Sequence, residues 1–165
     1  MKKNRLDLAK KLLSSGELVI FPTETVFGLG ADATNDRAVK SIFKVKKRPV
    51  NNPIICHFKN INQIEKYFDL SKFEKKLGLK FWPGPLTIIL KKKKNSKISK
   101  LVSNKSNLVG CRIPSNKLAN KLITSFDIPI AAPSANISER TSVTNIMDID
   151  PILEKKIFVL KDKQS

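Results

Sequence analysis

The 165-residue sequence is poor in the side chains that several common kinds of site require. His57 is the only histidine, so no other part of the chain can supply the histidine of a Ser/His/Asp triad, and multi-histidine metal sites are excluded. The only cysteines, Cys56 and Cys111, lie in apolar stretches without C-x-x-C spacing. That pattern predicts neither a disulfide framework nor a zinc site, and it is typical of the reducing cytoplasm.

Long apolar runs are missing as well. No segment approaches the roughly 20 apolar residues that a membrane-spanning helix needs, which excludes an integral membrane protein. The basic N-terminus is followed by a stretch, 6–20, that charged and polar residues interrupt too often for a signal peptide. We therefore expect a cytoplasmic protein with no membrane partner. The chain length predicts a single domain over residues 1–165, which can bury roughly 70% of the surface of the unfolded chain.

Acidic residues are scarce, and this gives the chain a formal net charge of +18, from 32 Lys and Arg against 14 Asp and Glu. A surface of this charge attracts polyanions, and nucleic acid first. Only five of the 32 are arginines, however, and arginine is the side chain that dedicated nucleic-acid sites favour for its planar fork. Two explanations of the charge are therefore equally good. Either the surface serves to bind nucleic acid, or the lysines reflect an AT-rich coding sequence and simply lie in solvent.

The apolar residues alternate between helical and strand spacing along the chain. Helices are predicted over 6–13, 36–47, 60–68, 71–81, 115–126 and 148–156. Strands are predicted over 18–21, 53–58, 86–90, 108–113, 128–132 and 157–160, with a tight extended return over 25–33 and a flexible basic loop over 91–97. Several of these strands are too apolar to have a wet face. The fold class is therefore predicted as α/β or α+β, with helices covering a sheet.

Four polar clusters lie at the ends of the apolar strands, where layered folds place their ligand sites. The first, 22–25, offers two threonine hydroxyls and the Glu24 carboxylate to a small polar ligand, although a turn that caps its own backbone has the same composition. The third is Arg112, which could equally be a strand-end cation in solvent. The fourth contains Ser134 and Asn136, which can donate or accept hydrogen bonds at a phosphate or ribose, or simply form a turn.

The second cluster is the basic run that contains Lys46 and Arg48 and ends at Pro49. Its cations can stabilise the dipole of the helix that ends there. They can also form a phosphate clamp, in which Arg48 supplies a planar fork and Lys46 a point charge. The sequence has neither a G-x-x-x-x-G-K-[ST] loop nor a G-x-G-x-x-G motif, so a bound nucleotide must be held by side chains and turn amides.

Taken together, the clusters and their neighbours form an ordered set of blocks that is found in one family. The blocks are Pro22-Thr23-Glu24-Thr25-Val26-Phe27-Gly28-Leu29, Lys46-x-Arg48-Pro49 with Asn52-Pro53 and His57, Pro83-Gly84-Pro85-Leu86-Thr87, Arg112-Ile113-Pro114, and Pro133-Ser134-Ala135-Asn136. On these blocks the sequence resembles the YrdC-like threonylcarbamoyl-AMP synthases, which begin the formation of threonylcarbamoyladenosine on tRNA. The resemblance covers about residues 8–160. It implies a mixed, twisted sheet with helices on both faces around a deep basic cavity.

The resemblance also implies a reaction, that of an L-threonylcarbamoyladenylate synthase, which is a nucleotidyltransferase. Such an enzyme joins L-threonine, bicarbonate and ATP into threonylcarbamoyl-AMP and pyrophosphate, with Mg²⁺ as the usual divalent cation. By this resemblance Lys46 and Arg48 are the catalytic cations, and Arg112 pairs with the threonine carboxylate. The resemblance assigns no residue as a metal ligand. The positions that match ATP-binding ones are Lys46, Arg48, Asn52, Ser134 and Asn136, and those that match threonine-binding ones are Thr25, His57 and Arg112.

Two departures from the family pattern carry expectations of their own. Leu108 stands where the family often has a threonine near the nucleotide, so we expect that contact to be lost or replaced. Family members also usually continue with a Ser-Thr-Val-Val-Asp-like strand that helps to close the site, whereas this sequence ends at Ser165. From residues 1–165 alone we expect a retained fold with an unpaired sheet edge beside 157–160, weak ATP binding and little turnover.

Two alternative functions follow from the same residues. A YrdC-like protein that binds double-stranded RNA or tRNA would keep the cavity and the basic surface without making an adenylate. Carbamoyl-adenylate chemistry of the hydrogenase-maturation type would use similar motifs, but within a much larger multidomain chain. Intact Lys46, Arg48, Ser134 and Asn136 favour the synthase, whose product would pass to the machinery that transfers the threonylcarbamoyl group to tRNA.

Overall fold

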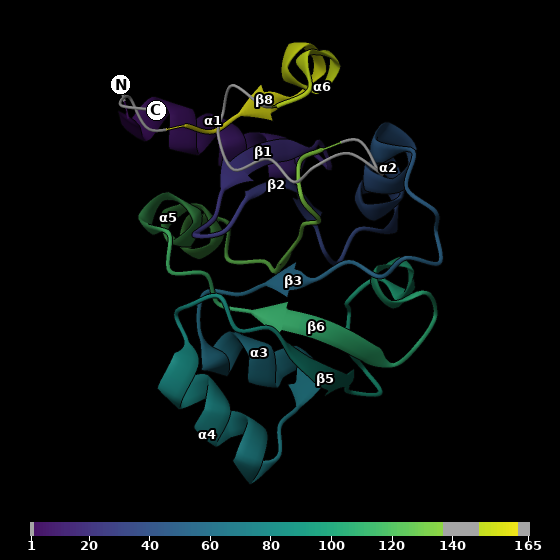
Figure 1. The fold of residues 1–165 in the computed structure, drawn as a ribbon, viewed down its shortest axis with the longest axis vertical. Helices are drawn as coiled ribbons and strands as arrows, with labels where there is room; N and C mark the ends of the chain where they lie inside the picture. The colour runs from purple at the N-terminus through teal and green to yellow at the C-terminus, as the bar shows by residue number, and fades with distance from the viewer. Residues whose placement is uncertain (1, 137–148, 162–165) are drawn as a thin grey trace.

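The computed structural model describes residues 2–136 and 149–161. Within these residues an eight-stranded mixed sheet has the order β4-β5-β6-β3-β7-β2-β1-β8 (Figure 1). The pairs β3–β6 and β1–β8 are parallel and the other neighbours are antiparallel. The strands are β1 (Val19–Pro22), β2 (Phe27–Asp32), β3 (Cys56–His57), β4 (Phe68–Asp69), β5 (Ile88–Lys92), β6 (Leu108–Arg112), β7 (Ile130–Ala131) and β8 (Phe158–Val159).

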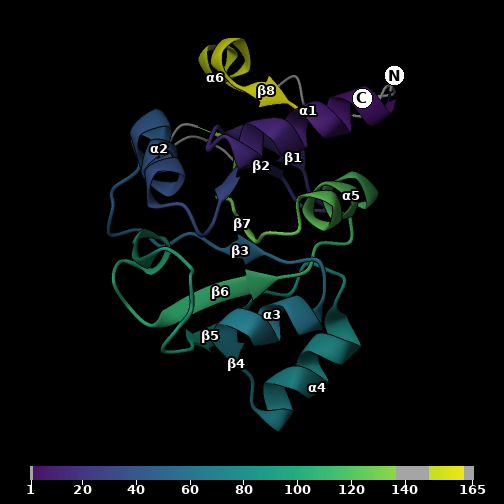
Figure 2. The same ribbon diagram turned by 180° about the vertical axis from the view of Figure 1, so that it is seen from behind.

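Helices lie on both faces of this sheet, which confirms the predicted α/β class. Figures 1 and 2 show α2 and α5 on opposite sides of β1 and β2. The helices are α1 (Lys2–Ser14), α2 (Asp36–Lys46), α3 (Ile61–Tyr67), α4 (Lys72–Phe81), the 3₁₀ turn η1 (Lys100–Ser103), α5 (Lys117–Phe126) and α6 (Pro151–Lys156). No helix in the described ranges combines the length and the apolar character that crossing a membrane requires.

Strand β1 separates two apolar cores because successive side chains of a strand point to opposite faces. Val19 and Phe21 pack with the apolar residues of α1 and α5 on one face. Ile20 packs on the other face with the larger core, to which α2 and α3 contribute Ile42 and Ile64. All five of these side chains are fully buried.

Local sequence signals account for the start and end of α2. The Asn35 side chain accepts a hydrogen bond from the Ala38 amide and so caps the N-terminus. At the other end Lys47 takes a left-handed conformation, with φ of 52°, and its amide donates to carbonyls of the last turn. The helix therefore ends at Lys46, one residue before its predicted end.

Several predicted elements have different bounds in the structure. The strand predicted over 53–58 is paired only at Cys56 and His57, because the Ile54 amide donates instead to the Val102 carbonyl in η1. The basic loop predicted over 91–97 is wrong at its start, since Lys91 is paired with Leu108 in the sheet. The helix predicted over 148–156 begins at 151, and residue 148 lies outside the described residues. The extended return over 25–33 is confirmed as β2.

The face that carries Phe21 continues across the sheet to β5. Paired residues point to the same side, so the pairing of His57 with Ile130 and with Arg112 places all three on this face. The Phe21 ring meets the His57 ring edge-on, with centroids 6.0 Å apart. Helices α1 and α5 cover the face over β1 and β2. Over β5 the face is open, since Ile89 is 64% exposed.

Candidate functional site

A cavity of about 170 Å³ opens on the uncovered side of this face, next to β3. Five of the eight predicted site residues line it, and these are Thr25, Arg48, His57, Arg112 and Ser134. The chain brings them together from the β1–β2 turn, the end of α2, two central strands and the segment after β7. Of the other three, Lys46 and Asn136 are buried behind the Arg48 side, while Asn52 is exposed beside it.

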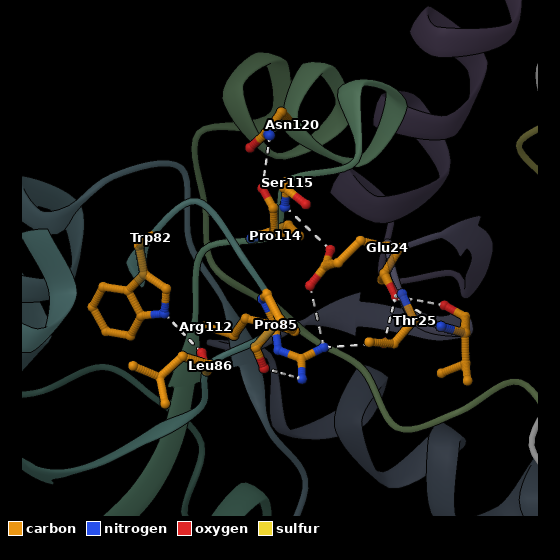
Figure 3. A network of polar contacts seen from close by, with 11 residues as sticks. Glu24, Thr25, Trp82, Pro85, Leu86, Arg112, Pro114, Ser115 and Asn120 are labelled. Atoms are coloured by element: carbon orange, nitrogen blue, oxygen red, sulfur yellow. Dashed lines mark hydrogen bonds and ion pairs between the residues drawn. The ribbon is translucent and has the colours of Figure 1, made fainter. Parts of the chain in front are cut away.

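Arg112 is held by three partners (Figure 3). Its Nη1 donates to Thr25 Oγ1 at 3.2 Å, and its Nη2 donates to the Pro85 carbonyl at 2.6 Å. Nη1 also lies 3.5 Å from Glu24 Oε1, so the two side chains form an ion pair. The Arg112 Nε is buried without a hydrogen-bond partner. Two of the five N–H groups of the guanidinium are thus engaged, and the group is fixed in place.

The partners of Arg112 are themselves anchored. Glu24 Oε2 accepts a hydrogen bond from the Ser115 amide at 3.1 Å. The turn that carries Pro85 is fixed by the Trp82 indole, whose Nε1 donates to the Leu86 carbonyl at 2.7 Å. Within this turn Gly84 leaves no room for a side chain, because a Cβ there would lie 2.5 Å from the Phe81 carbonyl oxygen. The first polar cluster included Glu24 as a candidate, whereas the contact of the Pro85 carbonyl with Arg112 was not predicted.

Both interpretations of the first cluster hold, because Thr23 caps its own turn and both Thr23 and Thr25 line the cavity. Thr23 Oγ1 accepts a hydrogen bond from the Val26 amide at 3.1 Å and donates to the Val26 carbonyl at 2.6 Å. This is the self-capping turn. The Thr25 hydroxyl lies 3.1 Å from Thr23 Oγ1 and receives the hydrogen bond from Arg112, so it belongs to the cavity.

His57 is a neutral base in the floor of the cavity. It is 2% exposed, and its pKa is lowered from 6.5 to about 4. Burial is the main cause and the positive charge of Arg112 adds to it, whereas a hydrogen bond with the Ile130 backbone acts in the opposite direction. Its Nδ1 is buried without a partner. At neutral pH the imidazole is uncharged, so one of its ring nitrogens is a hydrogen-bond donor and the other an acceptor.

The other side of the cavity is made by the end of α2 and the turn after β7. Arg48 Nε and Nη2 donate to the carbonyls of Asn52 and Pro53, at 3.2 and 2.8 Å. The Lys46 ammonium donates to the Ser134 carbonyl at 2.6 Å and to the Asn136 carbonyl. Burial, and secondarily the charge of Arg48, lowers the pKa of Lys46 to about 8. Lys46 thereby connects α2 to the Ser134–Asn136 turn. Asn52 contributes to this side of the cavity through its backbone carbonyl, which accepts the hydrogen bond from Arg48.

The Ser134 turn is also fixed to β2. Ser134 forms an antiparallel bridge with Gly28, and the Leu29 amide donates to the Pro133 carbonyl at 2.9 Å. Within the turn the Ser134 hydroxyl donates to Asn136 Oδ1 at 2.5 Å. Leu108, the departure from the family pattern, is 49% exposed on the same open face as Arg112.

Comparisons with known proteins identify the family of this chain. The profile of the Sua5_yciO_yrdC family, described as "Telomere recombination", matches residues 11–165. The threonylcarbamoyl-AMP synthase of Bacillus subtilis is 42% identical over 158 residues, which cover 93% of this chain and 44% of that protein. The putative threonylcarbamoyl-AMP synthase of Methanocaldococcus jannaschii is 37% identical over 161 residues, which cover 98% of this chain and 74% of the relative.

A solved structure gives the same result. The crystal structure of Pyrococcus abyssi Sua5 complexed with L-threonine matches with a TM-score of 0.90 and 38% identity, covering 96% of this chain and 46% of that one. The chain thus spans less than half the length of the Bacillus relative and of the Pyrococcus protein.

Proposed function

Since this chain belongs to the Sua5/YciO/YrdC family, we propose that its cavity makes L-threonylcarbamoyl-AMP and pyrophosphate from L-threonine, bicarbonate and ATP. The relatives named for this activity and the neighbour solved with L-threonine support the proposal.

The observation that carries the proposal is a pair of unsatisfied polar atoms in one cavity. Arg112 Nε and His57 Nδ1 are both buried without a hydrogen-bond partner, and both residues line the space. Leaving buried polar groups unpaired costs about 1–3 kcal/mol each, so such groups point to a ligand that pairs with them. The carboxylate of an amino acid matches the arginine, and its amine or hydroxyl matches the histidine. The Thr25 hydroxyl completes the polar lining.

ATP would bind at the Arg48 side. A cavity of about 170 Å³ suits a small amino acid, whereas pockets for larger ligands run to roughly 300–1,000 Å³, so the nucleotide extends over the open face. Arg48 and Ser134 line that side, and Lys46 and Asn136 fix the Ser134 turn. Mg²⁺ enters with ATP, because it is usually held by substrate phosphates and one or two carboxylates. It is therefore part of the substrate in this proposal.

The chemistry requires positioning and charge stabilisation. The threonine amine condenses with bicarbonate to a carbamate with loss of water, and neutral His57 lets the amine approach without repulsion between two cations. A carbamate oxygen then attacks the α-phosphorus while the bond to pyrophosphate breaks. Negative charge develops on the phosphates during this step, and Arg48 is placed to stabilise it. No nucleophilic side chain is needed.

The proposal places the protein in the cytoplasm, upstream of the machinery that transfers the threonylcarbamoyl group to tRNA. The net charge of +18 supports contact with RNA during that handover. A double-stranded RNA- or tRNA-binding protein without synthesis is the second candidate, favoured by the same charge. Such a protein would bind RNA with an affinity that falls steeply with salt, and would release no pyrophosphate.

The test is pyrophosphate release from ATP, measured with L-threonine and bicarbonate omitted in turn. We expect release only when both are present, together with formation of threonylcarbamoyl-AMP. Release that is indifferent to threonine would contradict the assignment. RNA binding without any release would favour the second candidate.

A further inference from the structure

The two arginines that line the cavity differ in how their charge is compensated. Arg112 lies 3.5 Å from the carboxylate of Glu24. Arg48 donates to two backbone carbonyls and forms no ion pair with any carboxylate of the described residues. At Arg48 a phosphate or a simple carboxylate therefore meets a positive charge that no described carboxylate neutralises. At Arg112 it meets an ion pair whose net charge is zero.

Glu24 compensates the charge of Arg112 but accepts no hydrogen bond from the Arg112 guanidinium. The N–H groups of Arg112 that are engaged donate to Thr25 and to the Pro85 carbonyl, and Nε remains free. Glu24 Oε1 has no hydrogen-bond partner, while Oε2 is fixed by the Ser115 amide (Figure 3). The carboxylate is thus held beside the guanidinium as a fixed negative charge.

We propose that Glu24 determines specificity: it restricts the Arg112 side to ligands that bring a positive charge along with their carboxylate. This inference rests on the proposed function and concerns the same site. A ligand carboxylate on Arg112 would place two negative charges around one guanidinium. The Glu24 and Arg112 side chains are only 15% and 13% exposed, so solvent screens this repulsion weakly. The ammonium of an α-amino acid zwitterion supplies the missing positive charge.

The same charge keeps phosphate groups out of the amino-acid subsite. Pyrophosphate and the ATP triphosphate carry several negative charges and no positive one, so they bind at Arg48, where no described carboxylate opposes them. Glu24 thereby sorts two anionic substrates between two arginines that are chemically alike.

The experiment compares two ligands that differ only in the ammonium group. L-Threonine and its des-amino analogue 3-hydroxybutyrate are titrated calorimetrically into the unaltered chain and into Glu24→Gln, which keeps the side-chain shape and an oxygen for the Ser115 amide. We expect the preference of the unaltered chain for threonine to fall about tenfold or more in Glu24→Gln, equivalent to about 1.4 kcal/mol. Glu24→Asp, which keeps the charge, should restore part of the preference.

Glu17→Gln is the matched control, because it removes an exposed carboxylate at the opposite end of β1 and should leave the preference unchanged. A second measurement needs no variant: inorganic pyrophosphate should not displace threonine from the unaltered chain. An unchanged preference in Glu24→Gln, or displacement by pyrophosphate, would overturn the inference while leaving the proposed function intact. Failure of the unaltered chain to bind threonine would instead overturn the proposed function.

Discussion

One face of the sheet is divided between two regions that differ in what lies above them. Over β1 and β2 the helices α1 and α5 cover the face, and Phe21 is fully buried there. Over β5 and β6 no described helix covers the same face, Ile89 is 64% exposed, and Arg112 points into a cavity. The strands on both sides have similar apolar composition. Helix cover therefore decides which half of the face becomes core and which half becomes a site.

His57 lies on the border of the two regions and shows properties of both. The covered half gives it the Phe21 ring as a neighbour and buries it, which is the main cause of its lowered pKa. The open half gives it Arg112 as a neighbour and a place in the lining of the cavity. One side chain is therefore both packed in the core and part of a cavity wall.

The largest expected effect is in the covered half. Phe21→Ala should lower the free energy of unfolding by about 3–5 kcal/mol, because the surrounding core cannot collapse into the space of the ring. Ile89→Ala, on the open half of the same face, should change it by less than about 0.5 kcal/mol. Urea unfolding measures both. Equal losses at the two positions would contradict the division of the face.

The next effect is in the open half and concerns rate. Arg48→Ala should cost about 2–4 kcal/mol of transition-state stabilisation, or about 30- to 1,000-fold in pyrophosphate release. Arg48→Lys should recover only part of this, because the planar fork is lost. Arg37→Ala, an exposed arginine on α2, is the matched control. Near-normal turnover of the Arg48→Ala variant would show that this arginine is only a helix-end cation.

The smallest of these effects concerns the border residue and depends on pH. The folded pKa of His57 is about 4 and the unfolded one 6.5, so the unfolded state binds the extra proton first as the pH falls. The contribution of His57 to the free energy of unfolding should therefore be nearly constant above pH 6.5. Below that pH it should fall, and at pH 5 the loss should be about 2 kcal/mol. Urea unfolding of His57→Gln over the same pH range should lack this decline. A variant that retains it would assign the decline to other groups.

The sequence allowed the fold to be predicted where a local signal exists. Asn35, Asn60 and Ser71 are side-chain caps of three helices, and each lies at the predicted helix start. The two-residue strand β4 was not predicted, and β7 was predicted longer than it is, because such short pairings depend on neighbouring strands and leave little local pattern.

For the site, the resemblance identified residues by type but not by contact. Five of the eight predicted residues line the cavity, whereas Lys46 is buried against backbone carbonyls. Glu24 was predicted only as part of the polar cluster at 22–25, and its ion pair with Arg112, 88 positions away in the sequence, was not predicted. The Pro85 carbonyl could not, because a backbone acceptor depends on the path of the chain and carries no signature of its own.

The brevity of β3 and β7 has a mechanical consequence. Each contributes two residues to the sheet, whereas the β1–β2 and β5–β6 ladders on either side pair four residues each. The middle of the sheet, between these two longer ladders, is therefore a seam in which each pair of strands is joined through two paired residues. The cavity lies over this seam, with Ser134 bridged to β2 on one side and Arg112 on β6 on the other. A ligand that contacts both would join the two halves of the sheet across this seam and restrict their movement relative to each other.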